Sequence, residues 1–494
     1  MSVSWECVWT LVRAVAISSC ACPVARLLAS HLESATLGRR HRSLLALALP
    51  LLTPGFVVAY AYTNLVLSFV HSPAVNEIFY DLLVAIQVVP VGTAVLLLAP
   101  PPPLSASGAW CERMVGGDRL RRVSSCRWHR RMLLGPTRQL VPAASLMALM
   151  VFHEFEVASL FRVTTGRSTT PASWSNALFE LIALQNLGNA DPSELWRASW
   201  LPLVCSVVLL GPVLALAWTT RVAPSSLAMA TPRRRRRRRH VLSVAWLGTA
   251  LLLGTLYPLC SLIIDGGRAW LGPRASQIVR HEHLWHCARS LLPALLAAVG
   301  AATFATWVVC RRRLGLLIMF ATPGLLGSLS LGVGFSWLVL MLSPGGLRHS
   351  ILAMIAGQGL WLLPRAAVLV VLLAVLPNQE HVHLASLLKH SPQDRQRRAG
   401  WSLAWQHAGR RFAWMVVLLA WWAYLELTLN ELLAPTAWIS ISQQMYQQMH
   451  FGRSMALSAS TLVVILFPIG TTVLLSRICR WLPWHKLYAW GGTR

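Results

Sequence analysis

Residues 317–343 read LIMFATPGLLGSLSLGVGFSWLVLMLS and contain no charged side chain. A helix of about 20 mainly apolar residues is long enough to cross the hydrocarbon core of a bilayer, which is about 30 Å thick. The whole chain has the same character, because 55% of its 494 residues are hydrophobic, 12% are charged and the mean hydropathy is +0.54. A soluble protein of this length cannot bury so much apolar surface. The sequence therefore predicts an all-α polytopic membrane protein.

The apolar residues fall into segments of about the length that a membrane-spanning helix needs. Eleven such segments are found, and the first is the most polar of them because it contains Arg13. The predicted spans cover about residues 6–28, 44–71, 78–100, 139–161, 198–219, 241–264, 290–310, 317–343, 350–376, 412–433 and 455–476.

The 44 Lys and Arg residues against 17 Asp and Glu give the chain a formal net charge of +27. Such an excess is also typical of nucleic-acid-binding proteins. The positive-inside rule explains it better here, because most of the basic residues lie in alternate connections between the predicted spans. This pattern predicts a multi-pass protein of the inner (plasma) membrane with a cytoplasmic C-terminus, an outer N-terminus and no nucleic-acid partner. The predicted cytoplasmic connections are about residues 39–42, 113–138, 221–239, 311–313, 389–411 and the C-terminal tail.

Two parts of the chain share an order of motifs. Thr-Pro-Gly occurs at 53–55 and at 322–324, each time within an apolar span. Two spans later, each part has a basic cytoplasmic stretch that begins with aspartate, Asp118-Arg-Leu-Arg-Arg-Val-Ser124 in the first part and Asp394-Arg-Gln-Arg-Arg-Ala-Gly400 in the second. The next span then carries a glutamate in each part, followed by Pro and Trp in an outer segment. Repeated halves of this kind are typical of membrane transporters.

The repeat predicts a first half at residues 1–220 with about five membrane helices and a second half at 241–494 with six. Either the first half has lost a helix or the chain as given starts late. Residues 221–240, which include seven consecutive arginines at 233–239, form the joint between the halves. This run could bind RNA or anionic lipid head groups, but the more common role of such a run is a solvated cytoplasmic linker.

The cytoplasmic stretch DRQRRAGWSLAWQHAGRRFAW (394–414), LLAPTAW (432–438) and MHFGRSMALSASTLVVILFPI (449–469) together resemble binding-protein-dependent ABC importer permeases. The resemblance is greatest to the fused, two-half permeases of the iron(III) and thiamine type. That family has a short cytoplasmic helix, the EAA loop, with the pattern E-A-A-x-x-x-G. Asp394, Ala399 and Gly400 match its Glu position, the residue before its Gly and the Gly itself. Asp118 and Ser124 take the Glu and Gly positions in the first half.

The resemblance implies the partners and the activity. A separate cytoplasmic ABC ATPase, in two copies, would dock on the loops near 113–138 and 389–411. An extracytoplasmic solute-binding protein would deliver a small solute such as iron(III) or thiamine, and the chain itself would catalyse no reaction and need no cofactor or metal. An ATPase within the chain is excluded on sequence, because the phosphate-binding loop G-x-x-x-x-G-K-[ST] requires a lysine. Neither Lys389 nor Lys486 lies in such a motif.

Ionisable residues inside predicted spans are costly to insert, at about 2.5 kcal/mol or more, and they often mark functional positions. Glu154 and Glu426 occupy equivalent places in the two halves. They are predicted to face each other across a transport pathway or to hold the halves together. The alternative is an interhelical hydrogen bond or a position near the outer interface. Arg365 is predicted to pair with one of the acidic residues in the spans. The other residues of this kind are Asp81, His153, Glu156 and Glu431.

A rival interpretation is a membrane enzyme or a non-transporting protein with a degenerate permease fold. It is motivated by Arg395 and Gln396, which stand at alanine positions of the EAA pattern, and by the cluster His281-Glu-His-Leu-Trp-His-Cys287. Closely spaced His and Cys can bind zinc or copper, but an interfacial belt of His and Trp explains the cluster better. The ten cysteines are scattered and predict no disulfide framework.

Overall fold

The computed structural model describes residues 3–33, 35–69, 71–98, 139–165, 173–186, 192–219, 237–271, 281–311, 313–342, 350–375, 384–385, 387–435, 438–449 and 455–481. Within these ranges the chain consists of helices and short connections, without a β-strand. The helices form two compact units, Met1–Ser261 (unit 1) and Leu262–Arg494 (unit 2). Predicted residues Asp118 and Ser124, and with them the whole connection 113–138, lie outside the described ranges.

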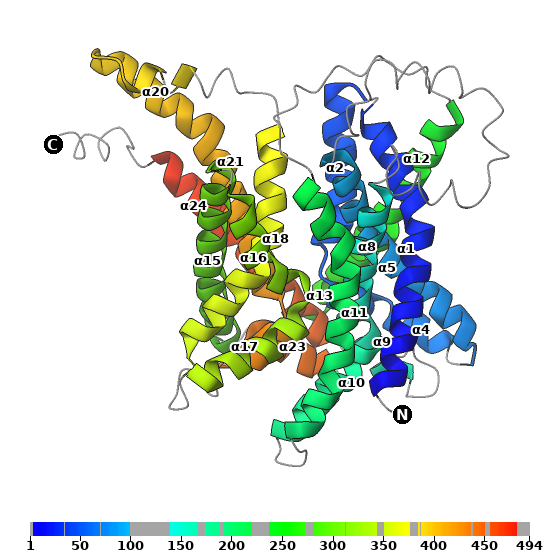
Figure 1. Ribbon diagram of the computed structural model, residues 1–494. Helices are drawn as coiled ribbons and strands as arrows, with labels where there is room; N and C mark the ends of the chain where they lie inside the picture. Colours follow the sequence, from blue (N-terminus) through cyan, green and yellow to red (C-terminus); the bar gives the residue numbers. More distant parts are fainter. Residues whose placement is uncertain are drawn as a thin grey trace. The chain divides into compact units, whose positions relative to one another are not determined.

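Unit 1 is built around three long helices that pack together, α1, α5 and α8 (Figure 1). Helix α11 packs on α8 and α1, and α12 packs on α2 and α1. The helices are α1 (Val3–Glu33), α2 (Leu37–Leu52), α3 (Gly55–Ala61), α4 (Thr63–Ser68), α5 (Pro73–Leu98), α8 (Leu140–Phe152), α9 (Glu156–Thr165), α10 (Trp174–Asn186), α11 (Pro192–Thr219), α12 (Arg237–Leu251), the π-helical turn η2 (Leu252–Leu256) and α13 (Tyr257–Trp270), whose later part belongs to unit 2.

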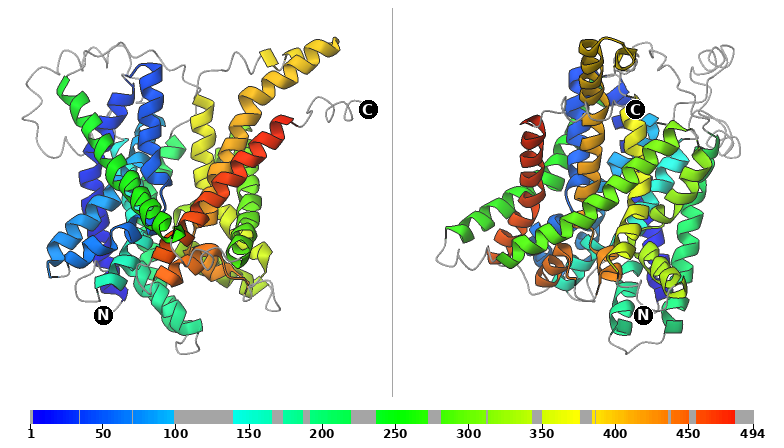
Figure 2. Two further views of the ribbon diagram at one scale, coloured as in Figure 1. Left: turned by 180° about the vertical axis from the view of Figure 1, so that it is seen from behind. Right: turned by 90° about the vertical axis from the view of Figure 1, so that its left-hand side faces the viewer.

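Unit 2 has a similar centre, in which α15 packs on α18 and α21, and α16 packs on α18. Helix α20 and the π-helical turn η4 continue α21 beyond the other helices of this unit (Figure 2). The helices are α15 (His281–Cys310), α16 (Leu314–Leu325), α17 (Ser328–Leu342), α18 (Ile351–Val375), α20 (Asp394–Ala404), η4 (Trp405–Gly409), α21 (Arg410–Leu425), α22 (Thr428–Leu433), α23 (Ile441–Met449) and α24 (Met455–Trp481).

The helices bear out the prediction of a multi-pass membrane protein. Among the described residues, eight helices are long and apolar enough to span a membrane, and two bent helix pairs could raise the number to ten. The count of eleven is not reached, because the predicted span 412–433 is interrupted at Glu426. It forms a helix of 16 residues and another of 6 residues.

The two Thr-Pro-Gly motifs lie in different places relative to the bends. In unit 1 the motif interrupts the helix itself, since α2 ends at Leu52 and α3 begins at Gly55, with an angle of 79° between them. In unit 2 the motif lies inside α16, and the bend of 105° comes after it, at Gly327. Gly327 has φ 87°, a left-handed conformation that favours glycine.

The π-helical turn η2 attaches the α12–α13 helix to the bend between α2 and α3. Such turns leave carbonyl groups free to accept other donors. The Tyr62 hydroxyl donates to the Leu253 carbonyl at 2.9 Å, and the Thr53 hydroxyl donates to Thr255 Oγ1 at 3.1 Å. Helix α12, which the sequence assigns to the second half, therefore packs within unit 1, and the boundary between the units follows Ser261.

Candidate functional site

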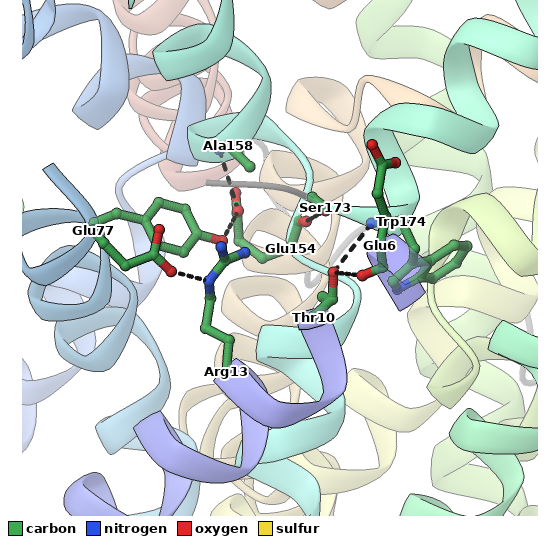
Figure 3. A network of polar contacts seen from close by, with 9 residues as sticks. Glu6, Thr10, Arg13, Glu77, Glu154, Ala158, Ser173 and Trp174 are labelled. Atoms are coloured by element: carbon green, nitrogen blue, oxygen red, sulfur yellow. Dashed lines mark hydrogen bonds and ion pairs between the residues drawn. The ribbon is translucent and has the colours of Figure 1, made fainter. Parts of the chain in front are cut away.

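Glu154 lies in the break between α8 and α9. Its carboxylate accepts the backbone N–H groups of Val157 at 2.6 Å and Ala158 at 3.3 Å, and the Tyr80 hydroxyl at 2.7 Å (Figure 3). The first N–H groups of a helix have no partner within it, and a carboxylate placed there satisfies them. Glu154 therefore stabilises the interruption of the membrane helix and the start of α9.

A partly buried ion pair lies next to this break. The Arg13 guanidinium on α1 pairs with the Glu77 carboxylate on α5, and it also lies 5.1 Å from the centre of the Tyr80 ring (Figure 3). The Arg13 side chain is only 3% exposed, and that of Glu77 is 28% exposed. Arg13, Glu77, Tyr80 and Glu154 thus connect three elements of unit 1, namely α1, α5 and the α8–α9 break.

The start of helix α10 is hydrogen-bonded to the break between α8 and α9. The Glu154 carbonyl accepts the hydroxyls of Ser173 at 3.4 Å and Ser175 at 2.9 Å. The Trp174 backbone N–H donates to Thr10 Oγ1 at 3.1 Å, while the Thr10 hydroxyl donates to the Glu6 carbonyl. These contacts hold the start of α10 against α1, and Trp174 is fully buried there.

Glu426 makes a corresponding set of contacts in unit 2. It lies between α21 and α22, and its carboxylate accepts the Leu429 N–H at 3.3 Å. Its carbonyl accepts the Ser442 hydroxyl at 2.9 Å, and the Ile441 N–H at the start of α23 donates to Ser290 Oγ on α15 at 2.9 Å. We call each set, the capping glutamate together with the serine, threonine and backbone groups bonded around it, a glutamate clasp.

The two clasps differ in what surrounds them. In unit 2 the Gln358 amide donates to Asn430 Oδ1 at 2.6 Å, and Asn430 donates in turn to the Glu426 carbonyl. Arg365 donates to the Trp361 carbonyl at 2.9 Å and lies 3.8 Å from the centre of the Trp361 ring. Among the residues that the structure describes, Arg365 forms no ion pair with Glu426.

Two further ionisable residues of the predicted spans have defined partners. The Glu156 carboxylate accepts the Phe56 N–H at 2.9 Å, so a side chain from α9 caps the start of α3 at the first Thr-Pro-Gly motif. His153 Nε2 lies 2.9 Å from the Ser206 hydroxyl of α11. The carboxylates of Glu154, Glu156 and Glu426 serve as caps. Sequence reasoning did not single out the partners Thr10, Tyr80 and Ser290, because serine, threonine and tyrosine are unremarkable in a membrane helix.

The predicted coupling residues on α20 divide into exposed and buried ones. Asp394 and Ala399 are exposed, and Asp394 pairs with Arg397 one helical turn away. Gly400 is buried, and a Cβ atom there would lie 2.7 Å from the Lys389 backbone nitrogen and 2.8 Å from the Leu388 carbonyl carbon. The Lys389 ammonium group lies 4.0 Å from the centre of the Trp401 ring. Gly400 therefore allows α20 to lie directly against residues 388–389 of its own chain.

The predicted His and Cys cluster gives no metal centre among the residues that the structure describes. Within these ranges no three His, Cys, Asp or Glu side chains are placed to hold a metal ion. Cys287 is buried. The side chains of residues 281–283 lie outside the described part.

Comparison with known protein families, with curated proteins and with solved structures finds no match to this chain. The function is therefore inferred from the fold and from the two glutamate clasps.

We expect equivalent substitutions in the two glutamate clasps to destabilise the protein by similar amounts. Thr10→Val and Ser290→Ala should each lower the free energy of unfolding by about 1 kcal/mol, because each leaves one buried backbone N–H without its acceptor. Thermal unfolding in detergent measures this loss. Thr306→Val is the control, because the Thr306 hydroxyl bonds only to the Ala302 carbonyl of its own helix. Equal losses of stability in all three variants would contradict the inference that Thr10 and Ser290 stabilise the starts of α10 and α23.

Proposed function

We propose that this chain is the permease subunit of an ABC-type importer, with two repeated halves that form the path for a small solute such as iron(III) or thiamine. The observation that carries the proposal is the recurrence of the glutamate clasp around Glu154 and Glu426. Each clasp joins an interrupted helix, a short outer helix and the first helix of its bundle. The recurrence supports duplication, and duplicated halves with interrupted helices are typical of membrane transporters.

The order of the elements supports the same proposal. Helices α1, α5, α8–α9, α10 and α11 have α15, α18, α21–α22, α23 and α24 as counterparts in chain order. In each set the first helix packs on the second and third, α1 on α5 and α8, and α15 on α18 and α21. Among the described helices, α12–α13 is without a counterpart, which agrees with a first half (1–220) that has one span fewer than the second (241–494), joined by the linker 221–240.

The proposed place of coupling is the cytoplasmic part of the chain. Helix α20 exposes Asp394, Arg395, Arg398 and Trp401, which are charged and aromatic groups suited to a protein partner. Gly400 sets the position of α20 by its contact with residues 388–389. Two copies of a separate ATPase would dock here and on the connection near 113–138, and nucleotide binding would move the halves between inward-open and outward-open states. A solute-binding protein would deliver the solute from outside.

Co-purification tests the proposal. The tagged protein, extracted from its native membranes in mild detergent, should retain a P-loop ATPase that mass spectrometry identifies. The variant Asp394→Arg with Gly400→Val should retain at least about tenfold less, because a loss of about 1.4 kcal/mol in binding energy is tenfold in affinity. Gly248→Val is the matched control, because no heavy atom lies within 4 Å of a Cβ placed there.

A folded wild-type protein that retains no ATPase would overturn the importer assignment. Equal retention of the ATPase by the double variant would place the coupling surface elsewhere on the chain.

A further inference from the structure

Two groups of arginines come together at one end of unit 1. Arg39, Arg40 and Arg42 lie in the first two turns of α2, and Arg237–Arg239 begin α12. Helix α12 packs on α2 and on α1. The starts of α2 and α12 lie beside the end of α1 that is away from the N-terminus (Figure 1). Both groups belong to connections that the sequence predicts to be cytoplasmic.

Contacts near both ends of α2 fix its position against α12. At one end, the Thr53 hydroxyl donates to Thr255 Oγ1 at 3.1 Å. At the other end, the centre of the His31 ring on α1 lies 4.9 Å from the centre of the His240 ring on α12. His31 Nε2 also lies 3.5 Å from Ser43 Oγ on α2. Helices α2 and α12 therefore run in the same direction, and their first turns lie at the same level.

Few acidic residues are available to neutralise these arginines. The sequence contains no Asp or Glu from residue 34 to 76 or from 195 to 264. Arg39 and Arg42 are exposed and Arg40 is half-buried. Within the described part of the chain, none of the three forms an ion pair. A concentration of positive charge with so little compensation favours an anionic partner.

The two basic turns are followed directly by exposed apolar residues. Leu45 lies one helical turn after Arg42, and Val241 and Leu242 follow His240 in α12. All three hydrophobic side chains are exposed. A phospholipid carries its charged head group directly beside its apolar tails, so it matches the arginines and the apolar residues together. Free phosphate or RNA matches the arginines alone.

We propose that the first turns of α2 and α12 form a binding site for an anionic phospholipid of the cytoplasmic leaflet. Guanidinium groups suit the phosphate, because they donate parallel N–H bonds to two of its oxygens. Basic clusters at the cytoplasmic ends of membrane helices are typical sites for anionic head groups. The positive-inside rule accounts for the number of arginines in these connections. The lipid site is inferred from their convergence on two packed helices beside exposed apolar residues.

A lipid titration tests the inference on the purified full chain in a non-ionic detergent. Fluorescent phosphatidylglycerol is titrated with the protein, and its anisotropy measures binding. The wild type should bind this probe at least about tenfold more tightly than the same probe with a phosphatidylcholine head group. The variant Arg39→Gln with Arg40→Gln and Arg42→Gln should bind phosphatidylglycerol at least about tenfold more weakly than the wild type, and phosphatidylcholine equally well.

The matched control removes the same number of charges from another predicted cytoplasmic helix. Arg395→Gln with Arg397→Gln and Arg398→Gln changes three exposed residues of α20 and should keep the affinity of the wild type for phosphatidylglycerol. Equal weakening in both triple variants would overturn the proposed site, because it would show attraction by net charge alone.

Competition identifies the class of ligand. Unlabelled phosphatidylglycerol should displace the probe at lower concentrations than inorganic phosphate or an oligoribonucleotide. Stronger displacement by either of the latter would overturn the lipid assignment in favour of free phosphate or RNA. The melting temperature of the α2 variant checks its folding. If that variant does not fold, Arg39→Gln with Arg42→Gln, which changes exposed side chains only, is tested by the same criterion. The sample contains no ATPase, so the outcome is independent of the importer proposal.

Discussion

Replacement of Arg13 by methionine is expected to lower the free energy of unfolding of unit 1 by about 3 kcal/mol, at the lower end of the usual effect of removing one partner from a buried ion pair, because the Glu77 carboxylate is partly exposed. The Arg13 side chain is 3% exposed and pairs with Glu77. Methionine has a similar length and no charge, so the variant leaves the Glu77 carboxylate without its cation. Chemical unfolding in detergent, followed by tryptophan fluorescence, measures the loss.

The control for Arg13 is the second ion pair among the described residues. Arg397 and Asp394 are 54% and 67% exposed, and Arg397→Ala should cost no more than about 1 kcal/mol, because water solvates both groups after the change. Arg13→Met combined with Glu77→Leu should recover part of the stability that Arg13→Met loses. Similar losses for Arg13→Met and Arg397→Ala would contradict the buried position of the first pair.

Gly324→Ala should destabilise unit 2 by about 3 kcal/mol, at the upper end of the usual cost of overpacking. A Cβ atom at residue 324 would lie 2.4 Å from the Leu360 carbonyl oxygen and 2.8 Å from Cδ of Pro364. Pro364 has no N–H to bond the Leu360 carbonyl within α18. The backbone of α16 approaches α18 at this carbonyl, and backbone atoms cannot move aside as the end of a side chain can. Thermal unfolding measures the effect.

Gly334→Ala is the control for Gly324→Ala. Gly334 lies in α17 of the same bent pair, and no heavy atom is within 4 Å of a Cβ placed there. This variant should be neutral or stabilising by up to about 1 kcal/mol, because alanine loses less backbone freedom than glycine in a helix. The two variants should therefore have effects of opposite sign, and a stabilising Gly324→Ala would disprove the close approach of α16 and α18.

The positions of the helices were largely predictable from the sequence. The predicted spans 78–100, 290–310 and 350–376 correspond to α5 (Pro73–Leu98), α15 (His281–Cys310) and α18 (Ile351–Val375). The interruptions were not predicted. Glu154 and Glu426 stand within apolar segments that look continuous, but their carboxylates cap N–H groups that follow them in the chain. The spacing of apolar residues in the sequence shows where a helix can form. An interruption of a helix leaves backbone N–H and C=O groups without helical partners, so it depends on other groups that bond to them.

Gly400 shows a second limit of sequence reasoning. The family resemblance assigned Gly400 to a loop on which an ATPase would dock, but the close contact of Gly400 is with residues 388–389 of the same chain. A glycine in an amphipathic helix indicates that some backbone lies nearby, and it does not say which one. The role of the exposed surface around Asp394 in docking stays a prediction.

The helical, membrane-spanning character of the chain follows from the sequence by itself, because the free energy of transferring apolar residues into lipid is a sum over neighbouring residues of one segment. Only the tertiary structure decides which polar groups meet. Thr10 and Trp174 are 164 residues apart, and Ser290 and Ile441 are 151 residues apart. A hydrogen bond depends on distance and direction to within a fraction of an ångström, and that geometry exists only after the helices have packed.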